Sequence, residues 1–209
     1  MAVIRPFECV RPQAEKAERV AALPYDVYNR EEACREVARE PLSFLKIDRA
    51  ETQFDSSVDT YAPEVYAKAK ELLENAIADG TFIKDSEQAY YIYELTMDGR
   101  VQTGLVACAS IDDYESNVIK KHENTRADKE LDRITHVDTC NAQTGPIFLA
   151  YRANAVINGE IDKAKKNSSL YNFVSPDGVR HQVWKISEPQ SVKAIRGAFE
   201  GISSIYIAD

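Results

Sequence analysis

The segment VIKKHENTRADKELDRITHVDTCNAQTGPIFLAY, residues 118–151, brings together more proton-transfer and anion-binding groups than any other window of the chain. Two of the three histidines lie in it, with glutamate, lysine and arginine side chains. The segment joins a strand end at Val118 to the apolar run at residues 146–151 through a charged, helix-forming stretch. How this stretch folds therefore decides how two predicted strands are connected.

Thr125-Arg126-Ala127-Asp128 has the pattern of a capping box, in which the Thr hydroxyl and the carboxylate three residues later bond the first turn of a helix. We predict a helix over residues 126–139. The spacing places apolar residues on one face, toward a core, and charged residues around the other side. The apolar set is Leu131, Ile134 and Val137, and the charged set is Asp128, Lys129, Asp132 and Arg133.

His122, Glu123 and Asn124 precede this helix and are expected in the loop that leads into its N-terminus. Backbone N–H groups and the positive end of the helix dipole make such a place suited to a phosphate or a carboxylate. The alternative is a capped surface helix whose charges are only solvated.

The composition indicates a soluble, cytoplasmic globular protein. The chain has 209 residues, of which 44% are hydrophobic, enough for one large or two small cores. No apolar run approaches the roughly 20 residues that a membrane span needs, and the N-terminus lacks a signal-peptide pattern. The net charge of −8 makes a nucleic-acid partner unexpected, because nucleic-acid binders usually carry a basic face.

The sequence lacks the motifs of several common metal, disulfide and nucleotide-binding sites. The four cysteines form no CxxC pair and have no histidine at ligand spacing, so neither a zinc site nor a disulfide framework is indicated. No GxGxxG or GxxxxGK[ST] motif occurs, which removes the main basis for a Rossmann or P-loop nucleotide site.

The N-terminal part is expected to begin with a strand at residues 3–7 and a short helix at residues 14–23. Pro24 then pushes its neighbour toward an extended conformation, and Asp26 can fold back as an Asx-turn. Asp26 is either a base or metal ligand on a site loop, or a structural turn residue. Asn29 caps a predicted helix to Arg39, and SFLKID at residues 43–48 is predicted as a short strand.

The remaining chain shows helix and hairpin patterns. Apolar spacing after Pro63 predicts a helix that stops at Asp79-Gly80. Two hairpins are predicted, 89–96 with 101–111 and 170–173 with 179–186, and a third strand edge is expected at Val118-Ile119. Further elements are a strand at 146–151, helices at 153–167 and 190–200, and a final buried strand at 203–209. His181, on the second hairpin, is expected to be a packed or solvated residue.

These elements predict a mixed α+β fold, with a largely antiparallel or mixed sheet built from hairpins and four or five packed helices. The spacing is too irregular for a doubly wound parallel sheet. Residues 1–209 are expected to form a single α/β domain or the N-terminal part of a longer protein, with a weak internal boundary near residues 85–87.

Six short blocks of the chain occur in the order and spacing of one known family. The blocks are IRPF at residues 4–7, PYDV at 24–27, HENT at 122–125, GPIFL at 145–149, DGVRH at 177–181 and YIAD at 206–209. The chain thereby resembles the bacterial and archaeal family catalogued as domain of unknown function number 1015. That family is described as similar to ParB/sulfiredoxin-fold proteins and to free-serine kinases.

The resemblance implies a cleft and a set of residues that line it. In similar proteins the last strand continues into an Asp-Gly-His-His-Arg segment that looks like a phosphate-binding turn, of which this chain has only Asp209. The resemblance therefore implies that a longer protein would complete the site, and that this chain would lack full activity. The implied cleft residues are Arg5, Asp26, His122, Glu123, Thr125 and Asp209.

Three functions are compatible with these residues. In a nucleotide-dependent phosphotransferase acting on a small hydroxylated metabolite such as free serine, Glu123 or Asp26 would be the base and His122, Arg5 or Lys129 would bind phosphate. ATP or another nucleotide with Mg²⁺ would be the cofactor. The alternatives are a non-catalytic nucleotide- or metabolite-binding module, and a scaffold whose active groups lie beyond residue 209. The expected partners are thus a metabolite and a nucleotide.

Overall fold

Two separate hydrophobic cores organise the chain. The computed structural model describes residues 1–122 and 125–208, and these residues form two units, each described here by itself. Unit 1 contains residues 1–9, 84–122 and 146–208, whereas unit 2 contains Val10–Ile83 and Thr125–Gly145. Neither unit is continuous in sequence, because the chain passes between them four times.

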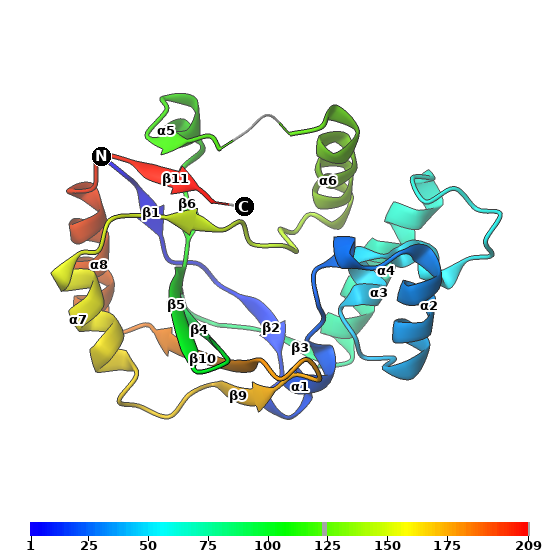
Figure 1. Cartoon of the computed structure of the whole chain (residues 1–209), viewed down its shortest axis with the longest axis horizontal. Helices are drawn as coiled ribbons and strands as arrows, with labels where there is room; N and C mark the ends of the chain where they lie inside the picture. The colour runs from blue at the N-terminus through cyan, green and yellow to red at the C-terminus, as the bar shows by residue number, and fades with distance from the viewer. Residues whose placement is uncertain (123–124, 209) are drawn as a thin grey trace. The chain divides into compact units, whose positions relative to one another are not determined.

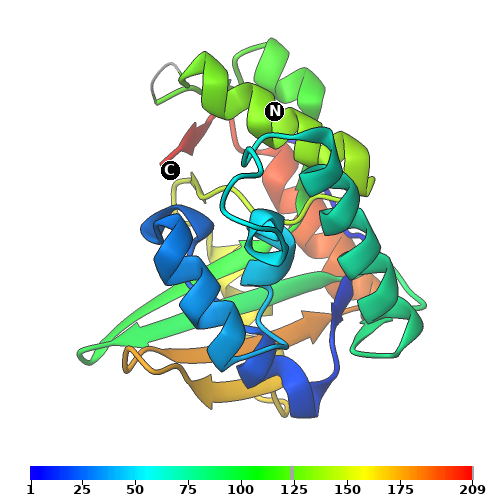
Figure 2. The same cartoon turned by 90° about the vertical axis from the view of Figure 1, so that its right-hand side faces the viewer.

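The largest sheet of unit 1 is antiparallel and has the strand order β5-β4-β10-β9 (Figures 1 and 2). Its strands are β4 (Tyr90–Met97), β5 (Arg100–Val106), β9 (Tyr171–Val174) and β10 (Arg180–Ile186). Both predicted hairpins are present. The first turns at Asp98 and Gly99, whose φ values of 50° and 78° suit the Asp-Gly sequence. The two hairpins join through β4 and β10, from Tyr90 opposite Ile186 to Thr96 opposite Arg180.

Two smaller sheets complete the strands of unit 1. In the first, β11 (Ile205–Ile207) lies between β7 (Ile119–Lys120), which is parallel to it, and β8 (Leu149–Ala150), which is antiparallel. In the second, β1 (Ile4–Arg5) pairs with β6 (Cys108–Ala109). The strand edge predicted at Val118-Ile119 is present as β7, shifted by one residue, and its partner is β11.

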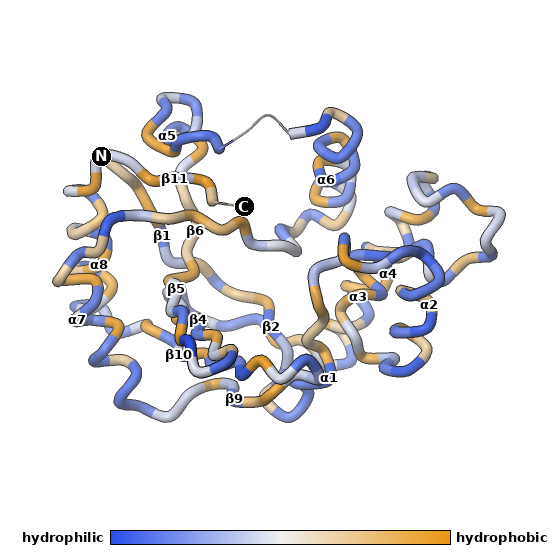
Figure 3. The backbone as a smooth tube through the Cα atoms, viewed as in Figure 1, coloured by the Kyte–Doolittle hydropathy of each residue, from blue (hydrophilic) through white to orange (hydrophobic). Residues whose placement is uncertain are grey.

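Helices α7 (Ala155–Ala164) and α8 (Pro189–Glu200) contact each other in unit 1, and α5 (Ile111–Glu115) is a single short turn. Figure 3 shows hydrophobic and hydrophilic residues alternating along α7 and α8, as amphipathic helices require. Their apolar residues enter the core of unit 1 with strand residues. The buried members of that core include Tyr90, Ile92, Ile157, Ile195, Phe199 and Trp184.

Unit 2 is mainly helical, with one small sheet of β2 (Val10–Pro12) and β3 (Phe82–Lys84). Its α-helices are α1 (Ala17–Val20), α2 (Arg30–Arg39), α3 (Leu45–Asp48), α4 (Pro63–Ala78) and α6 (Ala127–Cys140), and its 3-10 helices are η1 (Ala14–Lys16), η2 (Tyr25–Val27) and η3 (Ala50–Gln53). Asn29 and Glu32 form the capping box that starts α2. The long helix α4 packs on α3 and α6 and supplies Val65, Ala69 and Leu73 to the core.

The segment SFLKID is not a strand, contrary to the prediction. Residues 45–48 form the one-turn helix α3, and the backbone N–H of Arg49 closes it by donating to the carbonyl of Leu45. Alternate residues Leu45 and Ile47 are both buried, which made the pattern resemble a strand. Packing on α4 decided the conformation, because tertiary contacts override a weak local pattern over so few residues.

The helix predicted at residues 126–139 is present as α6, but its cap and its buried face differ from the prediction. Arg126 is the N-cap residue, without a side-chain cap bond, and the Asp128 carboxylate pairs instead with the Arg126 guanidinium at 2.7 Å. Leu131 and Ile134 are 65% and 57% exposed. The buried residues of the helix are Asp132, His136 and Cys140, which follow one another at four-residue spacing.

The fold is mixed α+β, as predicted. Among the described residues β7 pairs with β11 in parallel, whereas β1 with β6, β4 with β5 and β10, β9 with β10, and β8 with β11 are antiparallel pairs. Over the same residues the longer helices are α2, α4, α6, α7 and α8, and the other three α-helices have four or five residues. The similarity to ParB/sulfiredoxin folds stays a prediction. Within the described part of the chain, no helix combines the length and the apolar character needed to cross a membrane.

Substitution of Asn154, the N-cap residue of α7, should destabilise the protein. Its Oδ1 accepts from the backbone N–H of Val156 at 2.9 Å and of Ile157 at 3.3 Å. We expect Asn154→Ala to lower the free energy of unfolding by about 1 kcal/mol, measured by urea denaturation. The matched control is Asn158→Ala at an exposed position within the same helix, which should change it by less than about 0.5 kcal/mol. Equal losses in both variants would contradict the capping role.

Candidate functional site

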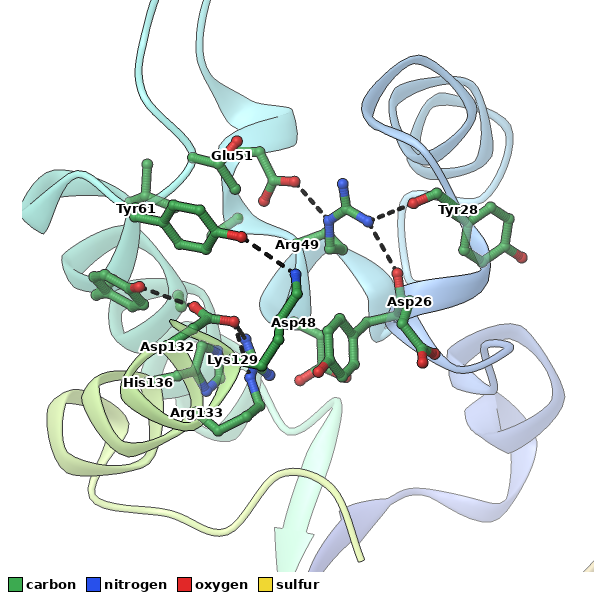
Figure 4. A pocket seen from close by; sticks show the side chains of 16 residues that line it. Asp26, Tyr28, Asp48, Arg49, Glu51, Tyr61, Lys129, Asp132, Arg133 and His136 are labelled. Carbon is green, nitrogen blue, oxygen red and sulfur yellow. Dashed lines mark hydrogen bonds and ion pairs between the residues drawn. The ribbon is translucent and has the colours of Figure 1, made fainter. Parts of the chain in front are cut away.

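A pocket of about 320 Å³ lies in unit 2, between η2, α3, η3, α4 and α6 (Figure 4). This volume is at the small end of the range for ligand pockets, roughly 300–1,000 Å³. The pocket is polar and strongly charged. Its charged lining consists of the carboxylates Asp26, Asp48, Glu51 and Asp132 and the cations Arg49, Lys129 and Arg133, and its other polar residues include Tyr25, Tyr28, Tyr61, Tyr66 and His136.

Arg49 holds one wall of the pocket in place. Its Nη1 donates to the backbone carbonyls of Tyr25 at 2.9 Å and Tyr28 at 2.6 Å, and its Nε donates to Oε1 of Glu51 at 2.5 Å. The Glu51 side chain is only 2% exposed. A partly buried arginine that is bonded on several sides is a positioning group, so Arg49 fixes the short segment that carries Asp26.

Asp132 organises a second wall. Its Oδ1 accepts from the hydroxyl of Tyr66 at 2.9 Å, and its Oδ2 accepts from Nη2 of Arg133, also at 2.9 Å. The Arg133 guanidinium lies over the ring of Tyr25, 4.3 Å from its centroid. Burial and the hydrogen bond to Asp132 raise the pKa of Tyr66, which therefore stays a neutral donor.

Asp48 and His136 lie deeper in the pocket. Oδ1 of Asp48 accepts from Oγ1 of Thr144 at 3.1 Å, and burial raises the pKa of the Asp48 carboxyl above its ordinary value. His136 is 2% exposed, and its Nε2 lies 3.1 Å from the carbonyl oxygen of Ile47. Its other ring nitrogen, Nδ1, is buried and has no hydrogen-bond partner among the described residues.

Lys129 and Asp26 are the exposed charges of the pocket (Figure 4). Nζ of Lys129 donates to the hydroxyl of Tyr61 at 3.3 Å, and this bond raises the pKa of Lys129. Lys129 makes no ion pair within the described part of the chain, whereas Arg49 and Arg133 are each paired with a carboxylate. The pocket thus offers a ligand one exposed ammonium group and one exposed carboxylate.

Of the residues predicted from the sequence, the structure brings Asp26 and Lys129 together. Thr125 is exposed in unit 2 and is not among the residues that line this pocket. Its predicted capping role is wrong, because Arg126 is the N-cap residue of α6. Arg5 and His122 are exposed residues of unit 1.

Two of the predicted residues cannot be placed. Glu123 and Asp209 lie outside the described residues. The expectation that one cleft gathers all the predicted groups therefore stays a prediction.

Comparison with known protein families gives the chain a family. The family described as "Protein of unknown function (DUF1015)" matches residues 4–209. The chain belongs to this family. No curated protein and no solved structure matches it. The description of the DUF1015 family states no activity, so the chemistry has to be argued from the pocket.

Most of the pocket of this DUF1015 chain was not predicted from its sequence. The polar face of α6 could have been found from Asp132 and His136, which are four residues apart and hence on one side of a helix. The apolar residues Leu131 and Ile134 lie on the other side of the helix, and they led to the prediction that this other side faces the core. Arg49 and Glu51 gave no local signal, because their importance comes from partners that only the folded chain supplies.

Substitution of Asp48 should change how stability depends on pH. Burial makes ionisation of the Asp48 carboxyl less favourable in the folded chain than in the unfolded chain. The free energy of unfolding therefore falls as the pH rises from the ordinary pKa of 3.8 through the raised pKa of Asp48 in the folded chain. Asp48→Asn cannot ionise and keeps an acceptor for Thr144. We expect it to unfold with a higher free energy than the native chain at about pH 7, with the difference disappearing toward about pH 4 in urea denaturation.

The matched control for this measurement is Asp138→Asn, at an exposed position of α6 that does not line the pocket. It should show no such divergence between the two pH values. The effect of burial would be refuted if Asp48→Asn and the native chain differed in free energy of unfolding by the same amount at both pH values.

Proposed function

We propose that this protein transfers a phosphoryl group from a nucleotide to the hydroxyl group of a small metabolite, and that the pocket of unit 2 receives the metabolite. The observation that supports this best is that Asp26 and Lys129, distant in sequence, line the same small pocket as its exposed carboxylate and exposed cation. Transfer to a hydroxyl requires a carboxylate that orients or deprotonates the acceptor and a cation near the transferred group.

In this proposal Asp26 takes the hydroxyl proton while the acceptor oxygen forms a bond to the terminal phosphorus of the nucleotide. The bond from that phosphorus to the bridging oxygen breaks, and the shortened nucleotide leaves with the electron pair. Lys129 balances negative charge on phosphate or on a carboxylate of the metabolite. The roles predicted for Arg5, His122 and Glu123 stay expectations from the sequence and are not assigned to this pocket.

The size of the pocket favours a small acceptor over a whole nucleotide inside it. Free L-serine is the first candidate, because the family resembles free-serine kinases. No group of three acidic, histidine or cysteine side chains suited to a metal occurs in the described part of the chain. Mg²⁺ would instead be held mainly by nucleotide phosphates and water, an arrangement that needs only one or two carboxylates.

A second candidate function is metabolite binding without transfer. It is favoured by the pairing of charges within the pocket, since Arg49 is bonded to Glu51 and Arg133 to Asp132. Charges that neutralise each other leave less electrostatic stabilisation for a developing transition state. Saturable binding of a metabolite with no phosphorylated product would support this function.

Turnover by the 209-residue chain tests the proposal directly. The chain is incubated with L-serine, Mg²⁺ and ATP, ADP or CTP in turn, and phosphoserine is detected by phosphorus NMR and mass spectrometry. We expect Asp26→Asn to lower kcat by about 100-fold or more, because a positioned general base contributes this much. Lys129→Met should mainly raise the KM of the substrate, and Asp138→Asn on the exposed side of α6 should leave both constants unchanged.

Two results would count against the proposal. Absence of any phosphorylated acceptor with every nucleotide, in protein shown to be folded by circular dichroism, would remove phosphoryl transfer by these 209 residues. Product formation that Asp26→Asn leaves at the native rate would keep the reaction but remove Asp26 as its base.

A further inference from the structure

The charges that line the pocket do not balance one another. Each of its two arginines is paired with a carboxylate. The lining charges that have no ion-pair partner in the described part of the chain are Asp26 on η2, Asp48 on α3 and Lys129 on α6 (Figure 4). When these groups are ionised, two negative charges and one positive charge await a partner. A ligand that brings a positive charge into the pocket is therefore favoured over one that does not.

Asp48 has one carboxylate oxygen bonded to the protein and one available to a ligand. Oδ1 accepts from Oγ1 of Thr144 at 3.1 Å, and no described group bonds Oδ2. Over the same residues, the enclosed side-chain atoms that lack a partner belong to His136 and Glu160, and not to Asp48. Oδ2 thus has accessible surface. Since Asp48 is half-buried and lines the pocket, a molecule in the pocket can reach this oxygen.

The fold itself does not require a charge at this position. An asparagine would offer the same acceptor to Thr144, whereas burial of the carboxylate disfavours its ionised form and raises the pKa of Asp48. Groups that lower stability within a pocket are characteristic of sites that bind or react. An ammonium group bonded to Oδ2 would offset the unfavourable burial, because it stabilises the ionised carboxylate.

We propose that Oδ2 of Asp48 binds an ammonium group of the ligand, and that the pocket thereby selects amino acids over the matching hydroxy and deamino acids. Lys129 in the same pocket suits the carboxylate of such a ligand, and Asp26 suits its hydroxyl group. This inference rests on the proposed function, since it names the class of acceptor. It concerns binding and can be tested without turnover.

Three substitutions separate the charge of Asp48 from its structural bond. Asp48→Asn removes the charge and keeps an acceptor for Thr144. Thr144→Val removes that bond and keeps the charge, at a residue that does not line the pocket. Asp138→Asn removes an exposed carboxylate of α6 outside the pocket and is the matched control for charge. Circular dichroism and urea denaturation establish that each variant is folded.

Calorimetric titration of the 209-residue chain at about pH 7 measures the selection. The ligands are L-serine, L-glycerate and 3-hydroxypropanoate, which differ only in carrying an ammonium group, a hydroxyl group or hydrogen at the second carbon. We expect the native chain, Thr144→Val and Asp138→Asn to bind L-serine about tenfold more tightly than either acid, the effect of one hydrogen bond between charged groups. Asp48→Asn should bring the three affinities to within about twofold.

The stability of Asp48→Asn distinguishes lost recognition from a damaged fold. A binding role predicts that this variant loses the preference for L-serine while unfolding with a higher free energy than the native chain at about pH 7. If the variant does not fold, carbon NMR of the native chain replaces it. The carboxyl resonance of Asp48 should then shift on addition of L-serine and not of 3-hydroxypropanoate.

Each other result overturns the inference. These results are equal affinities in the native chain, an unchanged preference in Asp48→Asn, an equal loss in Thr144→Val or Asp138→Asn, an unmoved Asp48 resonance, and no binding of L-serine, L-threonine or L-homoserine. The assay of turnover separates this inference from the proposed function. Phosphorylation of L-glycerate as efficiently as L-serine refutes only the selection by Asp48, whereas selective binding of L-serine without product refutes only the transfer.

Discussion

The ion pair of the partly buried Arg49 with the buried Glu51 is the constraint on which the pocket depends. Arg49 joins two segments distant in sequence, because it bonds Glu51 at the start of η3 and the carbonyl groups of Tyr25 and Tyr28 around η2. A guanidinium group suits this task, since its donors point in fixed directions within one plane. The exposed carboxylate of Asp26 is positioned only indirectly, through the backbone on either side of it.

The chemistry open to the pocket follows from which charges are already paired. Arg133 is bonded to Asp132 and stacked on Tyr25, so both arginines mainly shape the cavity. Lys129 and Asp26 are left to meet a ligand from the solvent side. A ligand that satisfies both groups carries an anionic group and a hydrogen-bond donor.

Local patterns were sufficient to predict the fold class and most elements. The hairpins were predicted because Asp-Gly turns require positive φ, and α2 was predicted because Asn29 is a favourable cap. The errors lie in segments whose conformation or orientation is decided by contacts with residues distant in sequence. SFLKID became a helix through its packing on α4, and α6 turned its polar face inward because Asp132 and His136 find partners far along the chain. Asp26 and Lys129 could be predicted as candidates, but not the residues that hold them.

The way the chain passes between the two units also bears on how the protein is made. The pocket combines residues of Val10–Ile83 with residues of Thr125–Gly145, and the bonds from His136 to Ile47 and from Thr144 to Asp48 span 89 and 96 positions. While the polypeptide is emerging from the ribosome, Arg49 and Asp48 are synthesised long before α6. A nascent chain arrested before residue 136 would therefore have no completed pocket, whatever secondary structure it had already formed.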